Sequence, residues 1–229
     1  MATSNNSSPD SSSPQKINLS TTQQLAFVNK GTKLVLYGIF AQIASSLIAM
    51  LSFIPLFPQL AGFVALAGKL SILIGYVFSL FAPEKTDARK YMIGALVVIA
   101  MGGIITELAS MILQYTSVDA GVRVFAILAT IAFAMPLVSL IFYLYFLKSI
   151  SDFTNQKDAS DEAEKLAVML MAITGAQFLI GIPLAMLAFT GLGVVSTIVG
   201  IVFLLATIYW TFLFIRFLDS LEFHDVSES

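Results

Sequence analysis

Long apolar runs alternate with short polar stretches along the chain, and this pattern dominates the sequence. Each run has about the 20 residues that a helix needs to cross roughly 30 Å of hydrocarbon. The pattern therefore predicts an all-α fold class, a polytopic transmembrane helix bundle over residues 34–217. We expect about six spans, at residues 34–55, 60–82, 91–113, 122–147, 166–189 and 193–217.

Prolines and glycines mark two of the joints between these spans. Pro55 and Pro58 end the first helix and start the second, because proline lacks the N–H that a helix interior needs. Gly191 and Gly193 interrupt the last apolar stretch, which is far too long for one span, and they predict a tight turn. The spans therefore pair as three hairpins, each entering the membrane from the same side.

Polar segments flank the predicted bundle at both ends of the chain. Residues 1–18 are rich in Ser, Asn and Pro and too poor in apolar groups to fold, so we expect a disordered tail. Residues 19–33 predict either an amphipathic juxtamembrane segment at the headgroup level or an extension of the first span. Ser20 and Gln23 have the spacing of a capping box there. Residues 218–229 form a second tail.

The basic residues lie almost entirely on one side of the predicted membrane. Cytoplasmic loops collect Lys and Arg, so this asymmetry predicts that both tails are cytoplasmic. Arg123 alone falls on the opposite side. Apolar helices also predict a bacterial inner membrane, because outer-membrane spans are β-barrels. The basic residues of the predicted cytoplasmic side are Lys16, Lys30, Lys33, Lys85, Arg89, Lys90, Lys148, Lys157, Lys165 and Arg216.

Composition narrows the classes of function. Hydrophobic residues make up 58% of the chain and charged residues 11%, against about 25% charged in soluble domains. A net charge of −2 offers no basic face to a nucleic acid. The chain has no cysteine, and its one histidine is His224, which excludes disulfides, thiolate or histidine-cluster metal sites and Ser-His-Asp triads. We expect no catalytic residues, no metal and no cofactor.

Three short stretches resemble a known kind of membrane protein. Residues 75–89 (GYVFSLFAPEKTDAR) are similar to a junction in uncharacterised multi-span proteins of planctomycete-type bacteria, as are residues 28–39 (VNKGTKLVLYGI) and 146–150 (FLKSI). The chain departs from that pattern at Lys85 and Asp87, where the family has Thr and Gly nearby. The resemblance implies a six-span protein with no assigned activity, and it supplies no catalytic residues.

Two charged residues, Lys69 and Glu107, lie inside the second and third predicted spans. An unpaired charge at that depth costs about 2.5–3.5 kcal/mol on insertion scales. Consecutive helices usually pack together, and the two side chains tilt toward each other, so we predict an ion pair. The pair could serve as an ion or proton relay or an anion site, or it could only fix helix register. The alternative is a snorkelling lysine and a near-surface glutamate that never meet.

Other polar and aromatic positions predict contacts within the bundle. Gln42 and Gln177 lie near the middle of their spans and predict interhelical hydrogen bonds or a polar path. Near the charged side, the Tyr and Trp residues at the ends of the even-numbered spans predict an aromatic belt at the headgroups: Tyr76, Tyr143, Tyr145, Tyr209 and Trp210. Glycines predict close helix contacts at Gly62, Gly68, Gly102, Gly103, Gly175 and Gly181. Kinks are expected at Pro136 and Pro183.

Two function classes follow from these observations. The first is a non-catalytic membrane module, a scaffold, assembly or regulatory partner that associates within the lipid bilayer with a second copy or another membrane protein. The alternative is a small transporter or channel that uses Lys69 and Glu107. An intramembrane enzyme comes third, because the chain lacks G-x-S-x-G, H-E-x-x-H and paired intramembrane carboxylates. Sparse polar residues in the spans favour the first class.

Overall fold

The computed structural model describes residues 19–49, 56–115, 118–181, 183 and 193–223, and these residues are helical apart from short connections. Six of the helices are long and apolar enough to cross a membrane. The predicted fold class is confirmed, and the chain is an integral membrane protein. The predicted tail at residues 1–18, Pro55 and Gly191 lie outside the described residues. The elements are α1 (Thr21–Ala49), α2 (Phe57–Ser79), α3 (Ala88–Tyr115), α4 (Val118–Phe153), α5 (Lys157–Ala176), the π-helical turn η1 (Gln177–Gly181) and α7 (Gly193–Ser220).

Helix α1 begins well before the predicted first span. It runs without a break from Thr21, so residues 19–33 contain the extension of the span, which was one of the two alternatives. The predicted capping box is formed. The backbone N–H of Ser20 donates to Gln23 Oε1 (3.1 Å), and the N–H of Gln23 donates to Ser20 Oγ (3.3 Å). Leu25 and Val28 in these first turns are buried against the bundle.

The connection between α4 and α5 is tight and hydrogen-bonded. Asn155 takes a left-handed conformation (φ 56°), which asparagine tolerates better than most residues. The N–H groups of Asn155 and Gln156 donate to the carbonyls of Asp152 (3.2 Å) and Ser151 (2.8 Å), which is the Schellman pattern. Helix α4 ends at Phe153 and α5 begins at Lys157. Both helices therefore extend beyond the predicted spans at residues 122–147 and 166–189.

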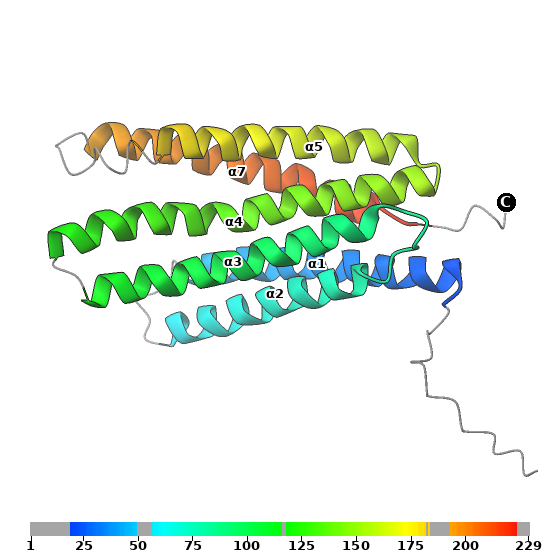
Figure 1. The fold of residues 1–229 in the computed structure, drawn as a ribbon, viewed down its shortest axis with the longest axis horizontal. Coiled ribbons are helices and arrows are strands. Elements are labelled where there is room, and N and C mark those ends of the chain that lie inside the picture. The colour runs from blue at the N-terminus through cyan, green and yellow to red at the C-terminus, as the bar shows by residue number, and fades with distance from the viewer. Residues whose placement is uncertain (1–18, 50–55, 116–117, 182, 184–192, 224–229) are drawn as a thin grey trace, which may run out of the picture.

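Most of the close packing is between helices that follow each other along the chain, with one weak link between α2 and α3. Helix α1 packs along α2, α3 packs along α4, and α4 also packs along α5. Helices α2 and α3 touch only slightly although they follow each other, and the α5–α7 contact is smaller than the α4–α5 contact. Figure 1 shows the α2–α3 and α4–α5 connections, the start of α1 and the end of α7 at one end of the bundle. We call this the loop end and the opposite end the far end.

A seam of small residues joins α1 and α2. Gly31 of α1 faces Gly75 of α2, and Gly38 faces Gly68. The two glycines on each helix are seven residues apart. A Cβ built on Gly31 would lie 2.6 Å from the carbonyl oxygen of Gly75, and one on Gly38 would lie 2.7 Å from that of Gly68. Glycine is therefore required at these positions, because the two backbones approach too closely for any side chain.

The remaining glycine predictions divide into two groups. A Cβ on Gly102 of α3 would meet the Met135 side chain of α4 at 2.8 Å, so this glycine makes a close contact as expected. Gly62, Gly103 and Gly175 have no described residue within 4 Å of a built Cβ, so they make no close contact within the described part of the chain. Spacing alone could not tell which face of a helix meets a neighbour.

Stacked aromatic rings fill the core at the loop end. Tyr76 of α2 stacks on Tyr143 of α4 with ring centroids 5.0 Å apart, and Trp210 of α7 stacks on Phe214 at 4.9 Å. All four side chains are fully buried. They lie inside the bundle and not in the predicted headgroup belt, because α2, α4 and α7 are too far apart for their backbones to touch and large rings fill that space.

Candidate functional site

Lys69 is the charged residue closest to the middle of a described span. It lies on α2 about 15 Å from the end of that helix at Ser79. The residue is exposed, so its side chain faces out of the bundle toward lipid. No hydrogen bond or ion pair joins it to any other described residue. Lys69 is therefore an unpartnered cation on the outer face of the protein.

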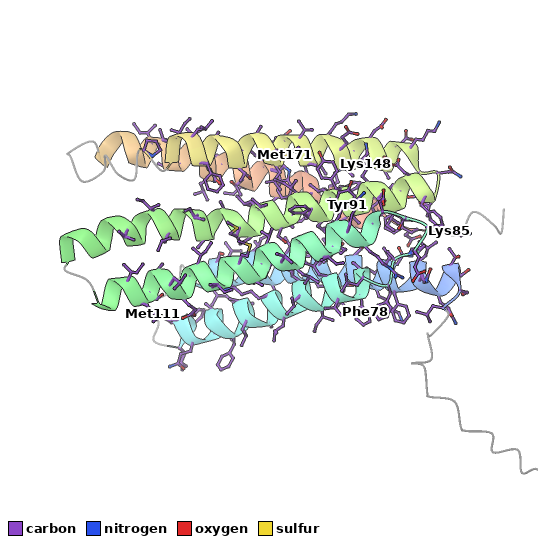
Figure 2. The ribbon with its side chains drawn as sticks, viewed as in Figure 1. Phe78, Lys85, Tyr91, Met111, Lys148 and Met171 are labelled. Atoms are coloured by element: carbon purple, nitrogen blue, oxygen red, sulfur yellow. The ribbon has the colours of Figure 1, made fainter. Side chains whose placement is uncertain are left out.

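Glu107 also faces outward, but at a different depth. It lies on α3 about 28 Å from the start of that helix at Ala88. Figure 2 shows Met111, one turn further along, near the far end of the bundle. Glu107 is exposed and makes no ion pair in the described part of the chain. Counted from the start of α3, this depth is close to the full thickness of a hydrocarbon core of about 30 Å, whereas Lys69 lies near the middle of its span.

The structure does not form the predicted Lys69–Glu107 ion pair. The prediction assumed that α2 and α3 pack together because they are consecutive, yet these helices touch only slightly. Their depths also differ by roughly 13 Å along the helices, which the two side chains cannot span. Ion pairs in the described ranges are Arg89–Glu84 (3.1 Å), Lys90–Asp87 (2.9 Å) and Lys148–Glu164.

Gln42 has a structural partner across the α1–α2 seam. Its Nε2 donates to the carbonyl of Ala65 on α2 (2.7 Å). Ser45 makes the same kind of bond to Ala61 (2.8 Å), and Ser71 of α2 donates back to a carbonyl of α1 (2.7 Å). The predicted interhelical bond of Gln42 is thus part of a series of side-chain to backbone bonds that hold one hairpin. The bond holds the Gln42 side chain in the α1–α2 seam.

Gln177 lies where α5 changes from α-helix to the π-helical turn η1. Its Oε1 is buried without a hydrogen-bond partner among the described residues, and so is Oγ1 of Thr174 one turn earlier. The Lys148–Glu164 contact sets the α4–α5 register and places this turn at the level of Pro136. Proline there leaves the carbonyl of Ala132 without its helical donor. Two neighbouring helices therefore depart from regular hydrogen bonding at one depth.

The loop end holds the densest polar network of the described residues. Asn29 of α1 binds the backbone of Phe223 twice, donating from Nδ2 to its carbonyl (2.9 Å) and accepting from its N–H at Oδ1 (3.1 Å). Gln156 donates to the carbonyl of Glu222 (2.7 Å). Residues 221–223 are thereby fixed across the ends of α1 and α5, and the Phe223 side chain is buried.

A second part of this network orders the α2–α3 connection. Arg89 donates from Nε to the carbonyl of Ala82 (2.8 Å) and forms an ion pair with Glu84. Thr86 donates from Oγ1 to the carbonyl of Pro83 (2.7 Å). Figure 2 shows Lys85 and Lys148 at this same end. Basic residues predicted for one side of the membrane, among them Lys85, Arg89 and Lys148, therefore lie at the loop end with both connections.

The interior offers little to reaction chemistry in the described part of the chain. The buried polar side chains there are Ser and Thr, and none is Lys, Arg, Asp or Glu. No three His, Cys, Asp or Glu residues among those described lie close enough to hold a metal ion. The hollow beside Asp161, Glu164 and Lys165 is open, and a single helix lines it. The outward-facing Lys69 remains the strongest candidate for interaction with another molecule.

The sequence identified Lys69 as a charged residue within a span, but it did not show that the side chain faces lipid or which residues surround it. It also missed Asn29, Thr174 and the π-helical turn, because neither amide-to-backbone contacts nor helix irregularities have a one-dimensional signature. No protein-family model, no curated protein and no solved structure matches the chain. The resemblance to uncharacterised planctomycete-type membrane proteins stays a prediction.

Proposed function

We propose that the protein is a non-catalytic integral membrane module, a scaffold, assembly or regulatory partner that binds another membrane protein through its lipid-facing helices. The observation that carries this proposal is the outward, unpartnered position of Lys69. A charge facing lipid is costly. A partner helix that pairs with it removes the cost, whereas a solitary bundle keeps it.

The packed interior supports a module without a transport path. Rings of Tyr76, Tyr143 and Trp210 occupy the space between helices at the loop end. Transport through an intramembrane ion pair was the alternative, and its two residues face lipid at different depths. These positions do not support transport through an ion pair, so the membrane module is the one function that we propose.

We also propose that the loop end faces the cytoplasm of a bacterial inner membrane. The basic residues at the start of α1, in both connections and near the end of α7 support this orientation. The cysteine-free chain allows a direct test with the single variants Lys85→Cys and Gln59→Cys, near opposite ends of α2. An impermeant maleimide should label Gln59→Cys in whole cells and Lys85→Cys only in inverted vesicles. The reverse pattern would contradict the orientation.

Photo-crosslinking in the native membrane tests the proposed function. A benzophenone side chain replaces Leu66, on α2 near Lys69, or Leu204 on α7, which is matched in exposure (55% and 58%). We expect discrete protein adducts from position 66 and mainly lipid adducts from position 204. Only lipid adducts from both positions would contradict a partner-binding module.

A further inference from the structure

We propose that the α2 face around Lys69 binds a transmembrane helix of another protein that carries a carboxylate near the middle of the bilayer. This inference rests on the proposed function and names the chemistry of its partner. The argument uses the depth of Lys69, the shape of the surrounding face and the exclusion of a second copy of this chain.

The depth of Lys69 separates it from both membrane surfaces. Helix α2 has 23 residues, or about 34 Å, which is close to the thickness of the hydrocarbon core. Lys69 lies about 2 Å from the midpoint of this helix, and an extended lysine side chain reaches only about 6 Å. Its ammonium group therefore falls several ångströms short of either headgroup layer. Pairing with a phosphate would require the bilayer to thin locally, which carries its own cost.

The face around Lys69 has the shape of a helix-packing surface. Gly62, Leu66 and Leu73 lie on it with Lys69, at the spacing of residues that share one side of a helix. Both leucines are exposed, and no described residue lies within 4 Å of a Cβ built on Gly62. The glycines Gly68 and Gly75 on the other side of α2 are already filled by α1. Helix α2 thus has one face filled by α1 and a second face, with Gly62 and Lys69, that no described residue covers.

A second copy of this chain does not supply the carboxylate. Both copies would have the same orientation, so the depth of every residue is kept in a symmetric dimer. Glu107 lies about 28 Å from the loop end and Lys69 about 15 Å, so the two cannot meet across such an interface. Two copies that met through this face would instead bring two lysines together. The partner is therefore a different chain with an acidic residue at the depth of Lys69.

The test uses the purified full-length chain in phosphatidylcholine vesicles and a designed probe. The probe is a synthetic Leu/Ala transmembrane helix with one central Glu, and its control carries Gln at that position. Energy transfer from a dye on Lys85→Cys to a dye on the peptide reports association. We expect the Glu peptide to bind about tenfold more tightly than the Gln peptide, as for polar contacts between model helices.

Three variants decide what the preference for Glu means. Lys69→Met should abolish it, Lys69→Arg should keep it, and Gly62→Leu should weaken both peptides because it fills the open face. Equal binding of the two peptides overturns the inference, as does a preference for Glu that survives in Lys69→Met. Energy transfer between labelled copies of the chain that disappears in Lys69→Met would identify a second copy as the occupant and also overturn it.

The inference and the proposed function fail in different ways. If position 66 yields protein adducts in native membranes but Lys69→Met leaves them unchanged, the module binds a partner and the acidic-helix inference is wrong. If position 66 yields only lipid adducts, the proposed function fails whatever the peptide measurement gives.

Discussion

The two halves of the bundle are held together by different means. At the loop end, large side chains from several helices meet in one core, and the largest fully buried residues, among them Trp210, Tyr76 and Phe146, all lie in that half. Toward the far end, the buried residues that the structure describes are mostly small, such as Ser45, Ala61, Ala109 and Ala134. Exposed leucines and isoleucines of that half lie on α1, α2, α3, η1 and α7, and α7 exposes them along its described far half.

This difference reflects the solvent. In lipid an outward leucine costs nothing, because the surrounding chains are as apolar as a protein core. The helices must therefore associate through complementary shape and through hydrogen bonds. The loop end uses stacked rings and a polar network, and the far half uses close contact of helix pairs through small residues. The loop-end half thus carries the cohesion between pairs, and the far half keeps surface for other molecules.

The largest effect should follow from Trp210→Ala, which removes the centre of the loop-end core. Trp210 is 1% exposed, stacks on Phe214 and donates from Nε1 to the carbonyl of Leu166 (2.9 Å). Truncation leaves a cavity and removes this hydrogen bond, so we expect a loss of about 3–5 kcal/mol of unfolding free energy, as for other buried large-to-small changes. Reversible unfolding in mixed micelles measures it.

Tyr209 provides the matched control for this variant. It is the neighbouring aromatic residue on the same helix and is 58% exposed. Tyr209→Ala should change the unfolding free energy by less than about 1 kcal/mol, because only lipid contacts are lost. Equal losses in the two variants would show that the loop-end half has no special role in stability.

The next largest loss of stability is expected at the α1–α2 seam, which runs from the loop-end half of the bundle into the far half. A Cβ on Gly38 would lie 2.5 Å from Cγ1 of Ile72 as well as close to the Gly68 backbone. Gly38→Leu should therefore force the hairpin apart and cost about 3 kcal/mol, at the upper end of typical overpacking. Gly103→Leu, at a position open to lipid, should be nearly neutral. Thermal denaturation of both variants compares them, and similar melting temperatures would contradict the seam.

The sequence predicted the spans and their pairing as hairpins, but not which residues face a neighbouring helix. Hydropathy identifies a residue that belongs in the membrane, yet it cannot say whether that residue faces lipid or protein, since both environments are apolar. Tyr209 and Trp210 are adjacent and equally suited to an interface by composition, but only the fold buries one and exposes the other. The spacing of Gly31 and Gly38 does repeat at the seam, although its partner face on α2 becomes clear only in three dimensions.

The candidate site shows the same limit. Lys69 was recognisable from its depth alone, because a charge in a long apolar run is rare. Glu107 was assigned as its partner through the rule that chain neighbours pack together. Helix α2 has two chain neighbours, and it packs closely on α1 but only slightly on α3. A pairing rule with frequent exceptions could not replace knowledge of which helices meet. Contacts of Asn29 with Phe223, 194 residues apart in the chain, had no local signal at all.

A smaller effect should follow from Asn29→Ala at the loop end. The variant removes both hydrogen bonds to the backbone of Phe223 and frees residues 221–223. We expect a loss of about 1–2 kcal/mol and faster amide hydrogen exchange in that segment. Gln156→Ala, which removes one bond to Glu222, should have about half the effect. Unchanged exchange at residue 223 in Asn29→Ala would show that other contacts hold the segment.

The smallest effect, and the one of opposite sign, concerns Gln177. Its Oε1 is buried with no donor among the described residues, at the depth where α4 carries Pro136, so desolvation of the side chain is not offset by a hydrogen bond there. Gln177→Met keeps the length of the side chain and removes the unpaired oxygen. We expect a gain of a few tenths to about 1 kcal/mol in unfolding free energy, in line with the value of polar contacts in membranes. Unfolding in the mixed micelles used for Trp210→Ala measures it. A clear loss would mean that Oε1 accepts a bond from water or a bound molecule, and the far half would then contain a polar site between α4 and α5.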